Sequence, residues 1–457
     1  MESIPDDTYA ANELYKYVTD SNKEANKFNQ PSKKGKEKNR DVFAITQSTS
    51  PIESLELIDL KFRGYGVEDE LYLIDDKAFS MLRRGSSLTY HKETKEYHIA
   101  RAGLVKFFDY KKHYDSKEKA MKRRVTLPMV ESKKKQSVYL TEKANGENFQ
   151  VSYNKIYSCY IVGSKNVTIA IRNEEDIKWY EENGKPKDRY SYVTDFAKVW
   201  LSIVEKKIGN KIEEFKNELG NHTLIGESVG DLTHQHIKLY SERDVIFYAI
   251  VDNFNTQNDI CLSLKKSFDL FKRYNLSYVP IEPSPQFESF EAMVPYINSK
   301  YDEVLLRTIE NGGEGCVAYF VENDEDGTEH ILNLAKLKTF DYRFYRKLRE
   351  ITKGIRDTKR KYTFTVEKAM KKIEADSHEL LEGNEDKVDF KWYMTFAKYF
   401  FEYCLKDQEN YSDVFAEFVV EMRNNFKEGI KNNDINIDEM KTKLTSKLKK
   451  DKKKQIK

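Results

Sequence analysis

The amino-acid sequence predicts an α+β domain followed by an all-α domain, and a contrast along the chain leads to this prediction. Residues 51–340 mix strand-like runs with a few amphipathic stretches, whereas residues 341–440 show helical spacing of apolar residues almost throughout. The chain has 457 residues, enough for two or three domains, and its 30 tyrosines and 26 phenylalanines can fill sizeable cores.

The individual elements follow from the same patterns. Runs rich in β-branched and aromatic residues predict strands over 222–230, 245–253, 316–323 and 330–338. Apolar residues at helical spacing predict helices over 195–215, 342–355, 391–405 and 413–426. The polar stretch 381–386 is expected to join two of the later helices.

The two ends of the chain are polar. Residues 1–50 are expected to form a flexible arm. Residues 441–457 hold nine lysines, which fit a solvated tail, a tether to a phosphate backbone or a nuclear localisation signal. Composition leaves these three interpretations of the tail open.

Composition also bounds the class of protein. The net charge is only +2, from 78 basic and 76 acidic residues, so any basic surface must be local. The cysteines are scattered, without a CxxC pair, which argues against a zinc site or a disulfide framework and fits a reducing compartment. No apolar run approaches the roughly 18–20 residues of a membrane span, and the acidic N-terminus is no secretory signal. We therefore expect an intracellular protein, nuclear or cytoplasmic.

Lys143 stands out between two strand-like runs in the stretch 138–154. The four residues Lys-Ala-Asn-Gly from Lys143 form a turn signal, yet a turn needs the Asn-Gly and not the lysine. Alone, this lysine is explained as an exposed turn residue. Farther along the chain come, in order, Ser164-Lys165, Glu227, Glu314 and a Lys-x-Lys.

The Lys-x-Lys consists of Lys336 and Lys338 at the end of a predicted strand. Alternate residues of a strand face the same side, so the two ammonium groups should point together. They repel each other unless an anion lies between them. The pair is therefore either a solvated strand face or a clamp on a phosphate.

This ordered series resembles the motifs of the covalent nucleotidyltransferases, which comprise DNA ligases, RNA ligases and mRNA capping enzymes. Most members carry Asp where this chain has Asn145, and the form with Asn is that of the fungal tRNA ligases. Three further stretches, within residues 60–355, resemble RNA ligase and fungal tRNA ligase patterns. They contain Arg101, Lys106, Phe107 and Phe108, then Glu227 and His236, and finally Tyr345, Arg346, Arg349, Glu350 and Lys353.

The resemblance implies a fold of antiparallel sheets with flanking helices, and an ATP-dependent RNA ligase that needs Mg²⁺ or Mn²⁺. Lys143 would attack the α-phosphate of ATP and form a Lys–AMP adduct. AMP would pass to an RNA 5′-phosphate, and a 3′-hydroxyl would then displace it. Lys336 and Lys338 would contact the α-phosphate, and Glu314 would hold the metal directly or through water.

Other residues take supporting roles in the same picture. Glu227 would bind the ribose, while Phe247 or Tyr248 would stack on adenine or belong to the core. Arg101 and Lys106 would handle the β- and γ-phosphates or the RNA 5′-phosphate. The remaining residues expected at the nucleotide site are Glu142, Asn145, Gly146, Ser164 and Lys165. Gly146 would let the backbone approach the nucleotide closely.

A second implication concerns the RNA end. Fungal tRNA ligases join ends with a 2′-phosphate beside the 3′-hydroxyl, and the resemblance implies that His236, Arg346 and Arg349 read that group. The two arginines, three apart on a predicted helix, share a face, and guanidinium forks suit a phosphate dianion. The alternative is that both are ordinary surface charges.

The nucleophile also sets an electrostatic requirement. A lysine attacks only when neutral, and its ordinary pKa near 10.4 leaves few neutral molecules at pH 7. We expect Lys336, Lys338 and a bound Mg²⁺ to depress the pKa of Lys143. Asn145 carries no charge, so a metal or base role of the usual Asp does not transfer to it.

Three alternatives remain open from the sequence. A DNA ligase or capping enzyme usually has a β-barrel after the Lys-x-Lys, whereas helices are predicted here. A general RNA-repair ligase would seal plain 3′-hydroxyl ends. A non-catalytic RNA-binding protein could retain the fold. The sequence shows no GxxxxGK[ST] or paired HxT or HxS motif, so separate kinase and phosphodiesterase proteins would prepare tRNA halves as its substrates.

Overall fold

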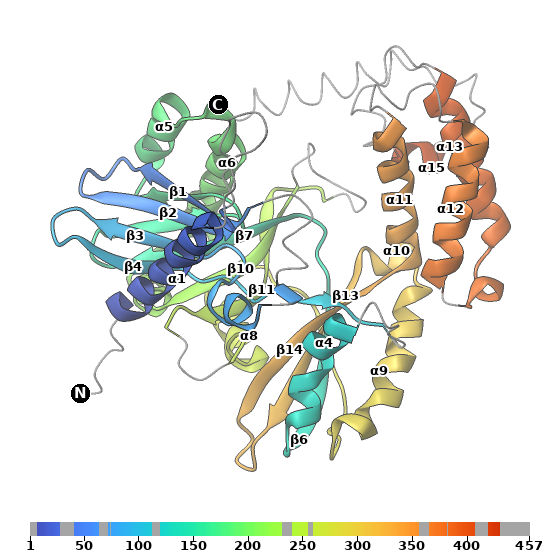
Figure 1. Ribbon diagram of the computed structural model, residues 1–457, viewed down its shortest axis with the longest axis horizontal. Coiled ribbons are helices and arrows are strands. Elements are labelled where there is room, and N and C mark those ends of the chain that lie inside the picture. Colours follow the sequence, from blue (N-terminus) through green and yellow to red (C-terminus); the bar gives the residue numbers. More distant parts are fainter. Residues whose placement is uncertain are drawn as a thin grey trace.

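Three β-sheets and their covering helices confirm the predicted α+β class (Figure 1). The computed structural model describes residues 7–27, 41–63, 72–73, 75–111, 119–230, 240–254, 259–355, 365–381, 383–406 and 419–429. All paired strands run antiparallel except β5 and β14. No helix among these residues is long and apolar enough to cross a membrane.

The first sheet is a four-stranded meander in the order β1-β2-β3-β4. Its strands are β1 (Phe43–Thr49), β2 (Leu55–Phe62), β3 (Ser87–His91) and β4 (Glu96–Arg101). The short helix α3 (Asp76–Met81) precedes β3 and is capped by the Asp75 side chain, which accepts a hydrogen bond from the Ala78 amide.

The prediction of a flexible arm over residues 1–50 is wrong for two of its segments. Residues 43–49 form β1, and helix α1 (Asp7–Lys27) packs against β4. Ala11, Leu14 and Val18 are at most 5% exposed, because their three- and four-residue spacing forms one apolar stripe. Polar residues around this stripe hide it in the average composition.

The second sheet has the order β11-β10-β7-β8-β9. Its strands are β7 (Glu147–Asn154), β8 (Cys159–Gly163), β9 (Thr168–Ile171), β10 (His222–Val229) and β11 (Asp244–Asp252). Helices α5 (Glu174–Asn183), α6 (Lys187–Ile203) and α8 (Leu264–Arg273) cover it. Trp200 of α6 is fully buried and packs near Phe149 and Phe247.

The helix predicted over 195–215 is interrupted. After α6 the chain passes through a π-turn (Val204–Ile208) and a 3₁₀ turn (Gly209–Lys211) before α7 (Ile212–Leu219) begins. Gly209 has φ +54°, a left-handed conformation that favours glycine and breaks the helix. Apolar spacing continued across this glycine, so the pattern alone predicted one helix.

The third sheet has the order β12-β6-β13-β14-β5. Its strands are β5 (Phe108–Asp109), β6 (Lys135–Glu142), β12 (Ile281–Pro283), β13 (Gly315–Asn323) and β14 (Glu329–Lys338). Helices α4 (Lys119–Glu131) and α9 (Phe290–Leu305) pack against β14, and the short α10 (Ile309–Gly312) leads into β13 (Figure 1).

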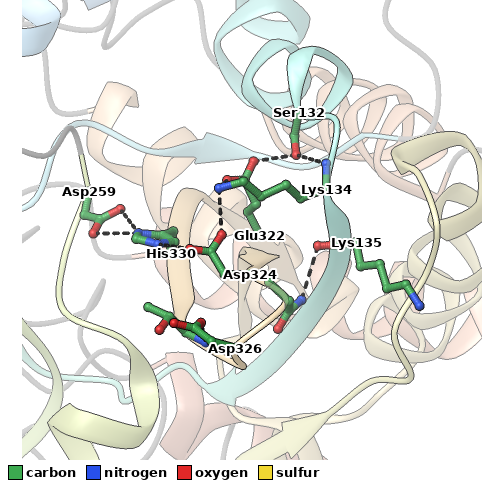
Figure 2. A network of polar contacts seen from close by, with 10 residues as sticks. Ser132, Lys134, Lys135, Asp259, Glu322, Asp324, Asp326 and His330 are labelled. Carbon is green, nitrogen blue, oxygen red and sulfur yellow. Dashed lines mark hydrogen bonds and ion pairs between the residues drawn. The ribbon is translucent and has the colours of Figure 1, made fainter.

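A network of charged side chains holds the turn between β13 and β14 (Figure 2). The His330 ring lies 3.2 Å from Asp259 and 3.3 Å from Asp324, while Lys134 Nζ lies 2.6 Å from Asp324 and 2.9 Å from Glu322. Burial opposes the charge of His330, but the two aspartates raise its pKa. The network lies at the end of β14 opposite the Lys-x-Lys, so its role here is to fix the hairpin.

Helices follow the third sheet, as predicted. They are α11 (Phe340–Ile355), α12 (Val366–Leu381), α13 (Phe390–Lys406) and α15 (Val419–Lys427), with a 3₁₀ turn at Glu385–Lys387. Figure 1 shows them grouped on one side of the molecule. Their core is continuous with that of the third sheet, through Phe340, Phe344 and Phe396. The lysine-rich tail lies outside the described residues, and the boundaries of separate domains stay a prediction.

Helix α1 supplies a test of this fold. We expect Leu14→Ala to lower the free energy of unfolding by about 2–5 kcal/mol, because it leaves a cavity against the first sheet. Urea unfolding measures the change. Asn12→Ala, at an exposed position of the same helix, should stay within about 0.5 kcal/mol of the parent. Equal stability of both variants would mean that α1 does not pack in solution.

Candidate active site

Lys143 lies where the chain crosses from the third sheet to the second. Strand β6 ends at Glu142 and β7 begins at Glu147, but the two strands do not pair with each other. The Lys143 amide donates a hydrogen bond to the Gly315 carbonyl, at 2.8 Å. This bond fixes the lysine beside the start of β13, where Glu314 is located.

An ion pair joins these two side chains. Lys143 Nζ lies 2.8 Å from Glu314 Oε2, and their side chains are 17% and 7% exposed. Asn145 is 1% exposed, and its side-chain amide donates to the same carboxylate at 3.4 Å. A carboxylate at position 145 could not donate this bond and would repel Glu314. Asn145 therefore positions Glu314 and does not itself line the pocket.

Gly146 has a different role from the one expected. A Cβ atom on this residue would lie 2.3 Å from the Ser228 carbonyl oxygen of β10 and 2.9 Å from a Val229 methyl group. The neighbouring strand, rather than a nucleotide, therefore excludes a side chain here. Glycine permits β7 to begin directly beside the end of β10.

Most of the predicted site residues line one cavity, which we call the Lys143 pocket, with a volume of about 520 Å³. The ten predicted residues that line it are Lys143, Gly146, Ser164, Lys165, Glu227, Tyr248, Glu314, Lys336, Lys338 and Arg346. They come from both large sheets and from α11. Since they are spread over some 200 residues of sequence, their convergence is a property of the fold.

Three predicted residues lie elsewhere for clear physical reasons. Phe247 is fully buried against Phe149 and Phe271, so Tyr248, its neighbour on the opposite face of β11, is the aromatic residue of the pocket. Glu142 likewise faces away from Lys143, into a separate cavity with Cys316. Of the two alternatives for the adenine contact, Phe247 belongs to the core and Tyr248 lines the pocket, while Glu142 lines another cavity.

Arg101 is also buried away from the pocket. It is 1% exposed and donates hydrogen bonds to the Ser164 carbonyl (2.7 Å) and to Thr168 Oγ1 (2.8 Å). The Asp59 carboxylate accepts a hydrogen bond from the Thr168 hydroxyl and balances the charge of Arg101. Arg101 therefore supports the loop that carries Ser164, and its expected phosphate contact is wrong.

The remaining predictions divide among three places. Lys106 lines a second cleft, described below, whereas Arg349 lines neither that cleft nor the Lys143 pocket. Arg349 is thus not brought together with Arg346 as expected, since only one of the two points toward the cavities. His236 lies outside the described residues.

The carboxylates around Lys143 set its protonation state. Burial alone would lower the pKa of Lys143, but Glu314 and then Glu227 outweigh burial and hold this pKa above its ordinary value. Lys336 and Lys338 alone do not depress the pKa of Lys143, because Glu314 acts on it more strongly; the expected depression also involved a bound Mg²⁺ and stays a prediction. Lys143 therefore rests in its charged form.

The two carboxylates differ from each other. Burial raises the pKa of Glu227 to about 8, against the opposing effect of Lys143, and the nearby charge of Glu314 adds to the rise. For Glu314, burial would raise the pKa, but Lys143, Lys338 and Lys336 lower it overall. Glu314 is thus the permanent anion of the pocket, while Glu227 is largely protonated near pH 7.

The Lys-x-Lys meets the pocket as predicted, with both side chains lining it. Burial lowers the pKa of Lys336 to about 7, and its Nζ lies 4.9 Å from the centre of the Phe107 ring. Lys338 forms an ion pair of 3.2 Å with Asp109 of β5, which pairs with β14. Segment 107–109 thus supports both lysines from a distant part of the sequence.

A second, larger cleft adjoins the pocket, with a volume of about 1190 Å³. We call it the basic cleft, because twelve of its lining residues are basic and only Asp109 and Glu350 are acidic. The basic residues are Lys61, Arg63, Arg83, Arg84, Lys106, Lys111, Lys165, Lys336, Lys338, Arg343, Arg346 and Lys347. Eight residues line both cavities, so the two are continuous.

Several of these residues were missed in the sequence. Asp109 was given no role, because its proximity to Lys338 arises from the pairing of β5 with β14. Arg84 belongs to the Arg-Gly of the upstream pattern but was given no role, and its charge acts on Lys336. Tyr342 and Arg343 directly follow the Lys-x-Lys, and Arg343 is three residues before Arg346. Arg343 and Arg349 both lie three residues from Arg346. Helical spacing alone could therefore pair Arg346 with either of them.

The pocket suits a metal ion that arrives with a phosphorylated ligand. No group of three or more His, Cys, Asp or Glu side chains among the described residues could hold a metal by itself. Mg²⁺ is commonly bound by one or two carboxylates together with substrate phosphates and waters. Glu314, which lines the pocket together with Lys143, fits that pattern as the ionised carboxylate.

A cavity that combines a buried lysine, two carboxylates and a second cluster of lysines defines a site for a phosphorylated ligand. Residues 136–338, which contain this cluster, match the family model described as RNA ligase. The match covers less than half of the chain and is a similarity of this segment to RNA ligases. No curated protein sequence matches the chain.

Solved RNA ligase structures show distant likeness. An archaeal ATP-dependent RNA ligase (form 1) is 13% identical, with a TM-score of 0.44 over 80% of this chain and 75% of that chain. The Naegleria gruberi RNA ligase with PPi is 12% identical, with a TM-score of 0.30 over 66% of this chain and 98% of that chain. The family match over residues 136–338 is the stronger of the two similarities.

The raised pKa of Glu227 predicts a pH-dependent stability. Between its ordinary pKa near 4.5 and the folded value of about 8, the folded protein binds more protons than the unfolded chain, so this group's contribution to stability falls as pH rises. We expect the parent to lose a few kcal/mol relative to Glu227→Gln between pH 5 and pH 8. Urea unfolding without nucleotide measures this difference. Parallel pH profiles of the two proteins would contradict it.

Proposed function

We propose that the protein is an ATP-dependent RNA ligase that uses Lys143 as its nucleophile. One observation carries the proposal: within a segment similar to RNA ligases, Lys143 and Glu314 form a buried ion pair in the same pocket as Lys336 and Lys338. An exposed turn lysine would have no such surroundings. A non-catalytic RNA-binding protein would have no need of a buried lysine with a carboxylate partner.

In the first step, Lys143 Nζ releases a proton to solvent and attacks the α-phosphorus of ATP. A nitrogen–phosphorus bond forms, the bond to pyrophosphate breaks, and a Lys143–AMP adduct remains. Lys336 and Lys338 stabilise the charge that develops on the phosphate oxygens. A Mg²⁺ or Mn²⁺ ion bound with ATP would supply further positive charge and would compete with Lys143 for Glu314. Structures of Naegleria gruberi RNA ligase variants contain ATP and Mn.

Two further steps join the RNA. The AMP group passes to the 5′-phosphate of one RNA end, which restores Lys143 and forms a phosphoanhydride. The 3′-hydroxyl of a second end then attacks the activated phosphate, a phosphodiester forms, and AMP leaves. In this scheme Glu227, largely protonated near pH 7, can donate a hydrogen bond to a ribose oxygen, and Tyr248 packs beside the base.

The finer proposal is a ligase of the tRNA-splicing type, which requires a 2′-phosphate beside the 3′-hydroxyl. The Asn145 form of the lysine motif and the segment after the Lys-x-Lys support this choice. Its substrates would be tRNA halves. The ends of these halves would be prepared by separate kinase and phosphodiesterase proteins. A general RNA-repair ligase that seals plain 3′-hydroxyl ends is the second candidate, and the basic cleft is compatible with it.

The nucleophile is tested by mass. After incubation with ATP and Mg²⁺, the parent should gain the mass of one AMP, and Lys143→Ala should gain none, because no other amine replaces its attack. Arg123→Ala, at an exposed site on α4, is the control and should form the adduct normally. An adduct that persists in Lys143→Ala would place the nucleophile elsewhere.

The RNA end is tested by a joining assay with two substrates that differ only in a 2′-phosphate. For the tRNA-splicing type we expect the 2′-phosphate end to be joined at least about 10²-fold faster, since an unpaired charged subsite penalises the plain end. Comparable rates for both ends would instead identify a general RNA ligase. A folded parent that forms no adduct with any nucleotide would support the binding-protein alternative.

A further inference from the structure

We propose that the basic cleft binds the RNA strand that supplies the 3′-hydroxyl, and that Arg343 holds a phosphate group of that strand. This inference rests on the proposed ligase function and adds to it the path of one of the two substrates. The phosphate is either a phosphodiester of the strand or a 2′-phosphate at its end, and both share the same chemistry of recognition.

The charge of the cleft is the first support. The whole chain has a net charge of +2, yet twelve basic residues and two acidic ones line this cavity. Phe62, Tyr72, Phe107 and Phe108 line it as well. Phe62, Tyr72 and Phe108 are at most 6% exposed, so these rings form the floor of the cleft and offer no stacking surface. The clustered cations suit a nucleic-acid strand, because its phosphates pair with them.

The size and position of the cleft indicate that it holds more than ATP. The Lys143 pocket, at about 520 Å³, is already within the range of small-ligand sites. The basic cleft is more than twice as large, and only four of its 24 lining residues fall inside the segment that matches the family. Its walls come from β2, the segment 83–85 and α11.

The chemistry of the last step selects the strand. AMP is the leaving group of that step and remains in the Lys143 pocket, so the 3′-hydroxyl must approach the activated phosphate from the opposite side, in line with the departing oxygen. Among the described residues, the basic cleft opens from the pocket at Lys336 and Lys338, the predicted phosphate contacts. A strand in the cleft would present its 3′ end at that point.

Arg343 is a buried arginine of the cleft, and its charge also acts on Asp109. It is 9% exposed, and its Nε and Nη2 atoms have no hydrogen-bond partner among the described residues. Arg346, one turn along α11, instead forms an ion pair with Glu350 at 2.8 Å. Buried guanidinium groups without acceptors are costly, and a phosphate supplies several acceptors in the geometry that the fork matches.

The experiment measures each of the three reaction steps separately in the parent and in Arg343→Gln. Sealing of a pre-adenylylated 5′ strand measures the third step alone. We expect the concentration of 3′-hydroxyl strand at half-maximal sealing to rise about tenfold or more, because charged hydrogen bonds are lost. Binding of a labelled 3′-hydroxyl strand should show a salt slope that is smaller by about 0.7. Formation of the Lys143–AMP adduct and its transfer to the 5′ strand should stay within about twofold.

Two matched variants complete the design. Lys61 lies at an exposed position of β2 on the other wall of the cleft. Lys61→Gln should therefore weaken binding of the 3′-hydroxyl RNA strand, with less risk to folding. Arg123→Gln, at an exposed site on α4 outside the cleft, should leave sealing unchanged. Thermal unfolding of each variant checks that the fold is retained.

The outcomes are distinct. A loss confined to strands with a 2′-phosphate assigns Arg343 to that terminal group, and an equal loss on plain strands assigns it to a phosphodiester. Unchanged sealing in Arg343→Gln and Lys61→Gln, or a defect in adduct formation or in transfer to the 5′ strand, would overturn the inference. A parent that forms no AMP adduct would reject the proposed ligase function instead.

Discussion

The buried ion pair between Lys143 and Glu314 governs the chemistry of the pocket. Each charge compensates the burial of the other, and removal of either one would leave an unpaired ion in a site with little water. The same pair keeps Lys143 protonated, and therefore unreactive as a nucleophile. Within the proposed function, a cation that accompanies ATP and attracts Glu314 would release Lys143 for attack. Activation of the lysine and binding of the nucleotide would thus be one event.

The position of this pair follows from the crossing of the chain between two sheets. β6 ends beside β13, which brings Lys143 next to Glu314, and β7 begins beside β10, which brings Glu227 to the same pocket. Asn145 and Gly146 make this crossing compact, one through a hydrogen bond to Glu314 and the other through its missing side chain. The four-residue motif therefore serves the fold as much as the reaction.

Residues in short motifs were predicted to lie together and do line one cavity, whereas the positions of other residues depend on burial that the motifs do not show. Lys336 and Lys338 were placed by strand alternation, which needs no knowledge of distant contacts. Phe247 and Tyr248 alternate on the same strand, but both faces of β11 are covered, so the pattern could not tell which ring meets the pocket. Arg101 looked like a free cation, because its partners Ser164 and Thr168 lie more than sixty residues away.

A single residue, Thr339, separates Lys338 from the first residue of α11. It is fully buried, donates its hydroxyl hydrogen to the Gly313 carbonyl at 3.1 Å and its amide hydrogen to the Glu314 carbonyl at 3.2 Å, and accepts a hydrogen bond from the Tyr342 amide. Strand β14, which carries Lys336 and Lys338, is therefore joined to α11 by one buried and fully bonded residue. A displacement of α11 would reach Lys338 and the loop that carries Glu314 through Thr339.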